Sequence, residues 1–552
     1  MAKLTDSVAM IRPLHFLPTI NDLTYMLNNT FVRRILWSLA VTVALHSVVY
    51  AAVELPGIFS DHSVLQSGRP VPVWGTGQPG ERVSVEFAGQ KKETAVDAQG
   101  KWMIKLEPML ACAQPRTMTI RSSNFERSIS DVLVGEVWLC SGQSNMSMPL
   151  GASGFSKGVI GGEAEIARPE QPELRLYCNA NDKEWKDAGL TGWQRANSAT
   201  RPPFSATAYF FGNAIQKDLN VPVGLINISA GGSSITPWTP KDAALRVPIV
   251  RHYQELFEQN KIEIGKHQAL MNQYQEVWRQ RHASGPTTNP PPIVPDPLPY
   301  NLFMAQRLGT SFGLYESFIA PIVPYALRGV IWYQGEANGD NLELSSSYEE
   351  MLRTLITSWR DSWKQPELPF YFVQLPCWDS DHASTWHINR QGMLNVLRSM
   401  PDVGMAVTVD VGDIHNLHPA NKRPVGERLA LWALAKTYEK PMVFSGPLVR
   451  ETAPEGDKLR VQFETCGSAL KLHGPAWTNL EVAGDDGLYY PATATISADT
   501  AIVGSPSVPR PVSVRYGWKP VFTPTLFNEE GLPASPFAFP PPTPMRTDYG
   551  AD

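Results

Sequence analysis

The sequence predicts an α/β protein whose helices cover both faces of a parallel sheet, with a β domain before it and another after it. From about residue 133, short apolar runs typical of strands buried on both faces alternate with helical stretches. Before that point, apolar and polar residues alternate with period two between Gly- and Pro-containing turns. The same short-strand pattern returns after about residue 440. These patterns in three successive parts of the chain indicate a central domain of strands and helices between two β domains.

The central strands are expected where the apolar runs lie, and helices between them. The runs cover 137–140, 223–228, 329–333, 370–375 and 405–409, with a weaker one at 174–177, and the clearest helical stretches are 206–217 and 348–363. Strands that alternate with helices favour a parallel sheet, because parallel neighbours need a crossover connection.

The domain boundaries follow from these changes of pattern. We expect an N-terminal β domain over 52–130, the central domain over 131–438, and a C-terminal β domain with its tail over 439–552. Residues 249–300 are predicted to be an insertion, which consists of a long amphipathic helix followed by a Pro-rich linker.

The first 51 residues have the pattern of a signal peptide region. Arg33-Arg34 is followed by an apolar run over 35–49 and by small residues before Ala52. The run is short for a membrane-spanning helix, so a cleaved signal is the first interpretation and an uncleaved anchor the second. Met26 is an alternative start, which would make 1–25 an extension. The pattern predicts an exported protein, periplasmic or extracellular, with no stable membrane insertion beyond this segment.

The amino-acid composition is typical of a folded globular protein, and the net charge is small. Apolar residues make up 43% and charged residues 18%, with a formal net charge of −5. This charge predicts no nucleic-acid partner. The five cysteines are scattered without a CxxC pair. The sequence therefore allows one or two disulfides without assigning them, and it predicts no zinc site.

Polar or glycine-rich segments follow four of the predicted strands, where catalytic groups of open α/β sheets gather. The segments are Ser-Gly-Gln-Ser-Asn-Met at 141–146, Ser-Ala-Gly-Gly-Ser-Ser at 229–234, Trp-Tyr-Gln-Gly-Glu-Ala-Asn at 332–338, and 410–419, which contains two aspartates and ends in His-Pro. Each segment alone also fits an ordinary polar loop. Together they supply a serine, a histidine to act as its base, and amide donors.

Taken together, these four segments resemble the SGNH-type hydrolases, and among them the sialate O-acetylesterase family and related carbohydrate acetylesterases. Gly-Gln-Ser-Asn-Met followed by Trp-Tyr-Gln-Gly-Glu at this separation is far more specific than Gly-x-Ser alone. The resemblance extends from about Leu55 to Phe537. It implies an SGNH three-layer α/β/α domain flanked by β-sandwich-like domains, and a serine esterase that removes acetyl groups from carbohydrate and needs no cofactor.

The family pattern implies a role for each matching residue. Ser144 would be the nucleophile and His418 its base. The oxyanion hole would be lined by the N–H of Ser144 and by that of Gly231 or Gly232. An amide from the segment between Gln334 and Asn338 would complete it.

The acid that orients His418 is the weakest part of the pattern. The wider SGNH pattern has an aspartate three residues before the base, and this sequence has His415 there. Asp413 is the first candidate, Asp410 the second and Glu336 the third. A Ser-His dyad assisted by a carbonyl is a further alternative.

Two other classes of protein compete with this hypothesis. One is a non-catalytic glycan-binding protein on an esterase scaffold, which the missing aspartate favours and the intact Ser144 and His418 oppose. The other is a metal-dependent hydrolase that uses the histidines and aspartates of 410–419, although the chain has no matching third cluster.

Overall fold

The computed structural model describes residues 53–154, 156–179, 182–283, 292–309 and 312–542. The predicted signal peptide region lies outside these residues. Within them, no helix is long and apolar enough to cross a membrane, and the five cysteines are free thiols. The unit that begins at Val53 contains all the elements described below.

The N-terminal strands form the β domain that their alternating pattern predicts. They are β1 (Val64–Gln66), β2 (Val71–Thr76), β3 (Arg82–Phe87), β4 (Gln90–Ala95), β5 (Lys101–Leu106), β6 (Cys112–Arg121) and β7 (Glu126–Gly142). Buried and exposed side chains alternate along β3 and β5, as expected for strands with one face on a core. β2 pairs with β5, and β3 pairs with β4 and β6, all antiparallel.

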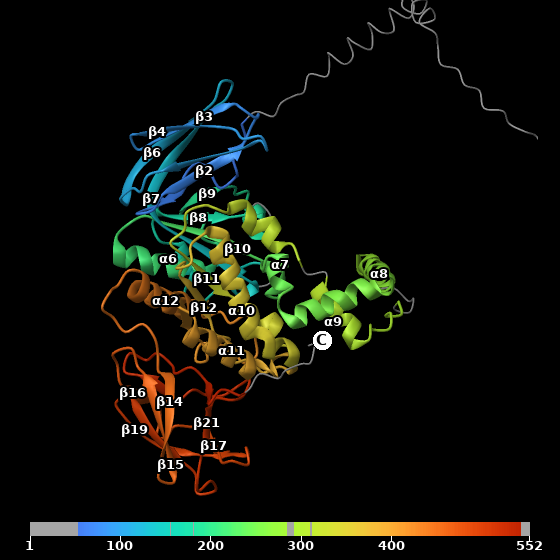
Figure 1. Cartoon of the computed structure of the whole chain (residues 1–552), viewed down its shortest axis with the longest axis vertical. Helices are drawn as coiled ribbons and strands as arrows, with labels where there is room; N and C mark the ends of the chain where they lie inside the picture. The colour runs from blue at the N-terminus through green and yellow to red at the C-terminus, as the bar shows by residue number, and fades with distance from the viewer. Residues whose placement is uncertain (1–52, 155, 180–181, 284–291, 310–311, 543–552) are drawn as a thin grey trace, which may run out of the picture. The chain divides into compact units, whose positions relative to one another are not determined.

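Strand β7 joins this domain to the central one without a break (Figure 1). Its first half pairs antiparallel with β6, and its second half pairs in parallel with the central strands. The predicted boundary at 130/131 therefore falls inside a single strand. The sequence pattern changes here, from alternating to continuously apolar, because every residue of β7 from Val132 onward is buried.

The central sheet has the order β13-β12-β11-β7-β10-β8-β9. Its further strands are β8 (Gln171–Cys178), β9 (Trp193–Ala196), β10 (Val223–Ser229), β11 (Gly329–Tyr333), β12 (Phe370–Val373) and β13 (Val403–Ala406). All pairs are parallel except that of the edge strand β9 with β8. The parallel sheet is confirmed, with β9 as an antiparallel edge strand that the sequence pattern does not predict.

Helices cover both faces of this sheet. The larger ones are α6 (Ala206–Leu219), α10 (Leu342–Trp363), α11 (Trp386–Ser399) and α12 (Arg423–Trp432). Trp138 of β7 packs against Phe211 of α6. Trp332 of β11 points to the other face, where it contacts Trp359 of α10. Because α12 packs on α6 and α11 on α10, each face has a pair of helices (Figure 1).

Short helices lie in the connections, several of them near the ends of the central strands. They are α3 (Ser144–Ser147), α4 (Gly162–Ile166), α5 (Lys183–Asp187), η1 (Thr236–Trp238), α7 (Lys241–Ala244), η2 (Tyr315–Ile319), η3 (Ala320–Ile322), η4 (Glu336–Asn338), η5 (Asp381–Ala383) and η6 (Ala433–Thr437).

The insertion contains α8 (Pro248–Ala283) and α9 (Tyr300–Gly309), which pack on each other beside the central domain (Figure 1). The backbone of α8 is non-helical at Asn260, so it consists of two helical pieces. The predicted helical stretch is present, but it is interrupted by this kink.

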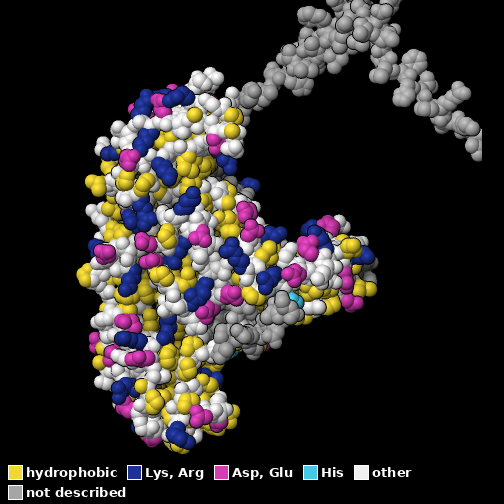
Figure 2. Space-filling model, viewed as in Figure 1, with side chains coloured by type: hydrophobic (Ala, Val, Ile, Leu, Met, Phe, Trp, Pro, Cys, Tyr) yellow, Lys and Arg dark blue, Asp and Glu magenta, His cyan; other side chains and the backbone are white. Residues whose placement is uncertain are grey.

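The C-terminal strands form two four-stranded antiparallel sheets and a two-stranded one. They are β14 (Leu448–Glu455), β15 (Lys458–Glu464), β16 (Leu470–Leu472), β17 (Leu480–Ala483), β18 (Tyr489–Pro491), β19 (Thr493–Ser497), β20 (Thr500–Gly504), β21 (Ser513–Tyr516), β22 (Leu526–Asn528) and β23 (Phe537–Phe539). Phe463 of β15 packs against Phe537 of β23, which joins the two larger sheets through a shared core. On the face of the molecule shown in Figure 2, acidic and basic side chains are interspersed over the N-terminal, central and C-terminal domains.

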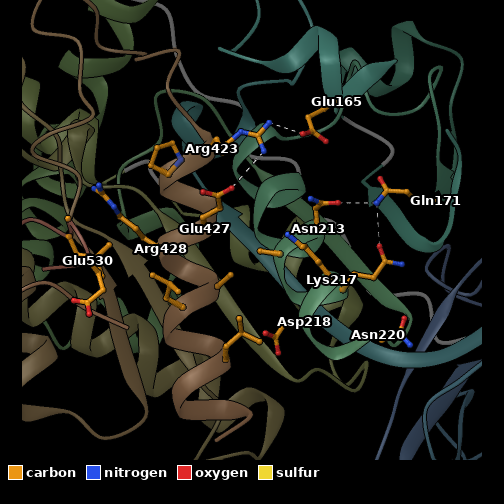
Figure 3. Close-up of a pocket in the computed structure, with 18 of the residues that line it drawn as sticks. Glu165, Gln171, Asn213, Lys217, Asp218, Asn220, Arg423, Glu427, Arg428 and Glu530 are labelled. Carbon is orange, nitrogen blue, oxygen red and sulfur yellow. Dashed lines mark hydrogen bonds and ion pairs between the residues drawn. The ribbon is translucent and has the colours of Figure 1, made fainter. Parts of the chain in front are cut away.

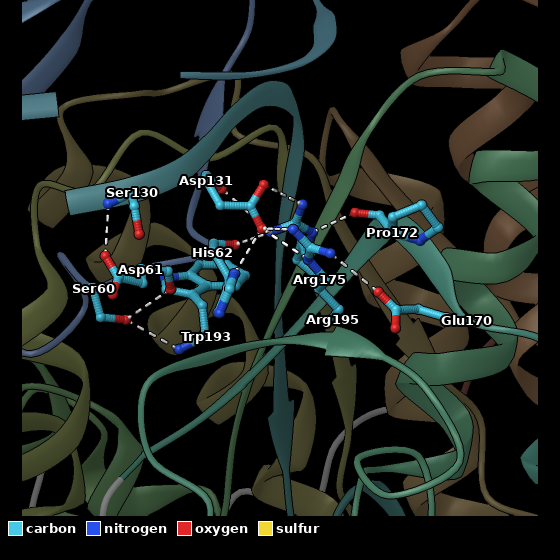
Figure 4. Close-up of polar contacts among 10 residues, drawn as sticks. All are labelled: Ser60, Asp61, His62, Ser130, Asp131, Glu170, Pro172, Arg175, Trp193 and Arg195. Atoms are coloured by element: carbon cyan, nitrogen blue, oxygen red, sulfur yellow. Dashed lines mark hydrogen bonds and ion pairs between the residues drawn. The ribbon is translucent and has the colours of Figure 1, made fainter. Parts of the chain in front are cut away.

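A charged cluster stabilises the junction at which β7 enters the central sheet (Figure 4). Asp131 accepts hydrogen bonds from Arg175, which is 1% exposed, and from Arg195, and it contacts His62 Nδ1 at 2.6 Å. Burial alone would raise the pKa of Asp131, but its hydrogen bonds with Arg175, His62 and Arg195 lower it to about 2.

Replacing Asp131 by alanine is expected to destabilise the protein by about 3 kcal/mol, because it leaves Arg175 buried without its carboxylate. The native carboxylate contributes stability above its unfolded-state pKa of 3.8 and loses that contribution as the pH falls toward about 2. Thermal melts at neutral pH and near pH 2 check both points. The difference in melting temperature between wild type and Asp131→Ala should be smaller near pH 2 than at neutral pH. An equal difference at both pH values would contradict this explanation.

Candidate active site

The backbone holds Ser144 in a tight turn directly after β7. Gly142 has φ 141°, and a Cβ there would lie 2.1 Å from the carbonyl oxygen of Tyr333, so only glycine fits. The N–H of Gln143 donates to the same Tyr333 oxygen at 2.9 Å. Ser144 then opens the short helix α3, half-buried at the carboxyl edge of the sheet. The turn thus presents the hydroxyl at the edge where the four segments meet.

His418 lies in the loop between β13 and α12 and contacts this serine. Its Nε2 is 2.8 Å from Ser144 Oγ. The N–H of His418 donates to the side chain of Asn416, which fixes the backbone of the loop. Burial, followed by the nearby charge of Lys422, lowers the pKa of His418 below 6.5. A neutral imidazole at hydrogen-bond distance is what a general base for Ser144 requires.

The glycine pair after β10 lies beside the same serine. A Cβ on Gly231 would be 3.7 Å from Ser144 Cβ, and the N–H of Ala230 donates to the carbonyl of Gly142 at 3.0 Å. Gly232 has φ 71°, a conformation that favours glycine. The sheet therefore brings the predicted Gly231 and Gly232 to the nucleophile, with exposed backbone that a substrate can approach.

The side chains of Gln334 and Asn338 are fully buried and bond to each other rather than lying at the surface. Gln334 Nε2 donates to Asn338 Oδ1 at 2.7 Å, and Asn338 Oδ1 also accepts from the N–H of Ile235. Gln143 is a third buried amide here, and its Oε1 accepts from Gln334 Nε2 and the N–H of Ala337. Through these contacts the amides predicted for the oxyanion hole hold Gln143, and with it the turn that carries Ser144, in place.

Glu336, the third candidate acid, faces a neighbour of the nucleophile. Its Oε1 accepts a hydrogen bond from Asn145 Nδ2, and its Oε2 has no partner among the described residues. Burial raises its pKa.

The two aspartates of the His418 loop contact other groups. Asp410 forms a two-point ion pair with Arg428 of α12, with both distances 2.6 Å. The carboxylate of Asp413 is exposed and accepts the N–H of His415. Asp410 thus ties the loop to α12 and Asp413 shapes a turn within it.

Two polar residues of this site have no role assigned from the sequence: Asn145, which appears there only as part of the serine motif, and Lys422. Lys422 is fully buried and donates to Asn145 Oδ1. Its place four residues after His418 is the only signal that the sequence offers, and nothing there shows that its side chain turns inward.

A cavity of about 980 Å³ opens near this region between α6 and α12 (Figure 3). Some of its charged side chains pair with one another, as Arg423 does with Glu165 and with Glu427. Ser144 and His418 do not line it. Among the described residues, no group of three or more His, Cys, Asp or Glu side chains is placed to hold a metal ion.

Comparison with known proteins identifies the family. The model of the family described as "Carbohydrate esterase, sialic acid-specific acetylesterase" matches residues 134–275 and 308–435. The sialate O-acetylesterase of Rattus norvegicus is 30% identical over 416 residues, which cover 69% of this chain and 72% of the rat protein. The chain belongs to the sialate O-acetylesterase family. It is therefore a carboxylic ester hydrolase, as the motifs predict.

Two further relatives support this assignment. The human sialate O-acetylesterase is 29% identical over 415 residues, 68% of this chain and 69% of the human protein. The crystal structure of a carbohydrate acetylesterase from Xanthomonas citri superposes with a TM-score of 0.71 at 30% identity, covering 88% of this chain and 99% of that one. The family match includes all four strand-end segments and omits 276–307, which spans the end of α8, the Pro-rich linker and most of α9.

Proposed function

We propose that this esterase removes O-acetyl groups from carbohydrate through an acetyl-enzyme on Ser144. The observation that carries the proposal is the 2.8 Å contact between Ser144 Oγ and His418 Nε2 at the carboxyl edge of the sheet. The names of its relatives, sialate O-acetylesterase and carbohydrate acetylesterase, support the substrate class.

In the first half of the proposed reaction, His418 takes the proton of Ser144 as Oγ attacks the acetyl carbonyl. The tetrahedral intermediate then collapses, the ester bond breaks, and the imidazolium gives its proton to the departing sugar oxygen. In the second half, water attacks the acetyl-enzyme, with His418 again as base, and acetate leaves. The sugar regains a hydroxyl, and no electron donor or acceptor is needed.

Backbone donors beside the serine would stabilise the oxyanion. The first N–H groups of a helix have no partner inside that helix, which applies to Ser144 at the start of α3. Gly231 lies beside Ser144, and its N–H would be a second donor. Each such donor typically contributes about 10²–10³-fold to the rate. Gln334 and Asn338 support this hole through Gln143 and the Gly231 loop, since their own amides donate inside the protein.

The acid of the proposed triad is testable with Asp413→Asn and Asp410→Asn. Because the Asp413 carboxylate is exposed and bonds a backbone N–H, we expect Asp413→Asn to retain kcat within about fivefold, well short of the loss of a catalytic group. Asp410→Asn is expected to lower thermal stability, since it breaks the ion pair with Arg428. Steady-state kinetics and melts on both variants separate these effects. A loss of about 10²-fold or more in kcat for Asp413→Asn would instead identify it as the orienting acid.

The substrate class is tested by acetate release from acetylated sialic acid, acetylated xylo-oligosaccharides and a simple aryl acetate. We expect release from at least one glycan with kcat/KM well above that for the aryl acetate. Activity on the aryl acetate alone would contradict the carbohydrate assignment. Tight glycan binding without acetate release from any substrate would favour the non-catalytic alternative.

A further inference from the structure

The buried ammonium of Lys422 contacts Asn145, the residue that follows the proposed nucleophile. Lys422 is the residue before α12, and its side chain is 0% exposed. Nζ donates to Asn145 Oδ1 and lies 5.4 Å from the centre of the Tyr333 ring, over its face. A lysine so deeply buried is rare, because removing its charge from water is costly unless partners compensate.

Asn145, the partner of Lys422, joins three of the strand-end segments. It follows Ser144 directly, and its Nδ2 donates to Glu336 Oε1 and, at 3.0 Å, to the carbonyl oxygen of Leu417, the residue before His418. One amide therefore links the nucleophile turn, the Glu336 segment and the base loop. Lys422 fixes the orientation of that amide, since a protonated amine can only donate and so selects the oxygen of Asn145.

The charge of Lys422 also acts on the base. Burial lowers the pKa of Lys422 to about 7 although Glu336 opposes the shift, so the amine is charged below about pH 7. In that range its charge adds to burial in lowering the pKa of His418. Strongly shifted groups with a specific partner gather at functional sites.

The other charged and titratable groups around the pair come from several elements. Glu336 and Tyr333 face Lys422 from η4 and β11, Ser144 faces His418 from α3, and Asp410, Asp413 and His415 lie on the His418 loop itself. Asp410 is paired with Arg428 and Asp413 is exposed, whereas Lys422 is buried and its charge lowers the pKa of His418.

We propose that Lys422 is a positioning residue of the esterase reaction, which through Asn145 holds the Ser144 turn against the His418 loop. This inference rests on the proposed roles of Ser144 and His418. It assigns to Lys422 an effect on turnover and on pH dependence, which a residue that only stabilises the fold would not have.

The test compares Lys422→Met, Lys422→Gln and Lys422→Arg with wild type, and with Lys440→Met as a control at a partly exposed lysine paired with Asp218. Two quantities are measured from pH 4.5 to 9: kcat and KM for acetate release, and the rate at which a fluorophosphonate labels Ser144. Melting curves establish that each variant is folded. If Lys422→Met does not fold, the Gln and Arg variants carry the test, since both retain a donor for Asn145.

For the Met and Gln variants we expect kcat to fall roughly 10–100-fold, as for a small misplacement of reacting groups, with KM nearly unchanged. The acid limb of the labelling and kcat/KM profiles should move to higher pH, toward 6.5, because His418 loses a repelling charge. Lys422→Arg should keep the wild-type acid limb while kcat falls, and Lys440→Met should match wild type.

Folded Met and Gln variants with a wild-type kcat, or with an acid limb that does not move, would overturn this inference. Wild-type protein that releases acetate but is not labelled at Ser144 would overturn the proposed function itself. The two failures are therefore distinguishable in one set of experiments.

Discussion

Replacing Ser144 by alanine is expected to lower kcat for acetate release by about 10⁴-fold or more, the scale seen when a catalytic serine is removed. The methyl group of alanine cannot attack the acetyl carbonyl, so the acetyl-enzyme cannot form. KM should change little, since the glycine loop and the rest of the surface remain. Stability should be nearly unchanged, because the described contact of the Ser144 hydroxyl is with one half-buried histidine.

Ser147→Ala is the matched control for this experiment. Ser147 lies on the same short helix, and its hydroxyl donates only to the backbone oxygen of Gln143, at 3.3 Å, among the described contacts. We expect it to retain near-wild-type kcat. If Ser144→Ala keeps more than about a tenth of the wild-type kcat, the nucleophile is elsewhere and the reaction needs a different mechanism.

Replacing His418 by alanine is expected to be almost as damaging, with kcat reduced by about 10³–10⁴-fold. Among the described contacts, the imidazole is the base that meets the Ser144 hydroxyl, and without it the serine proton loses this acceptor. The double variant Ser144→Ala/His418→Ala should be no less active than the worse single variant, because the two groups act as one unit. Acetate release by all three variants, measured at fixed pH, checks both statements.

His415→Ala serves as the control, since His415 is exposed and lies three residues before His418 on the same loop. It should leave kcat nearly unchanged. Losses in the two single variants that multiply in the double variant would show that Ser144 and His418 act independently. Equal losses for His415→Ala and His418→Ala would show that the base is wrongly assigned.

The sequence predicts the fold and the pair at its centre because both depend on local signals. Apolar runs mark the central strands, and Ser144 is found because its motif directly follows one of them. β9 is missed because its residues alternate little and its pairing depends on β8. The amides of Gln334 and Asn338 are recognised, but only the packed structure shows that both point inward and support the turn.

The residues that support Ser144 and His418 are harder to predict, because their roles depend on the direction in which each side chain points. Neighbouring residues in the sequence do not determine that direction. Asp410 looks like a partner for His418 from its position in the chain, yet it meets Arg428, which lies one helix further on. Lys422 looks like a surface lysine after a loop, yet it is buried against Asn145. Long-range packing decides both cases.

The most direct test of the central claim is to look for the acetyl group on Ser144. Wild-type protein is mixed with an activated acetyl ester, quenched in acid within the first turnover, digested and examined by peptide mass spectrometry. We expect the peptide containing Ser144 to carry one acetyl group, which disappears on continued incubation and is absent in Ser144→Ala. Acetate release at the wild-type rate with no acetylated Ser144 at any quench time would contradict the central claim.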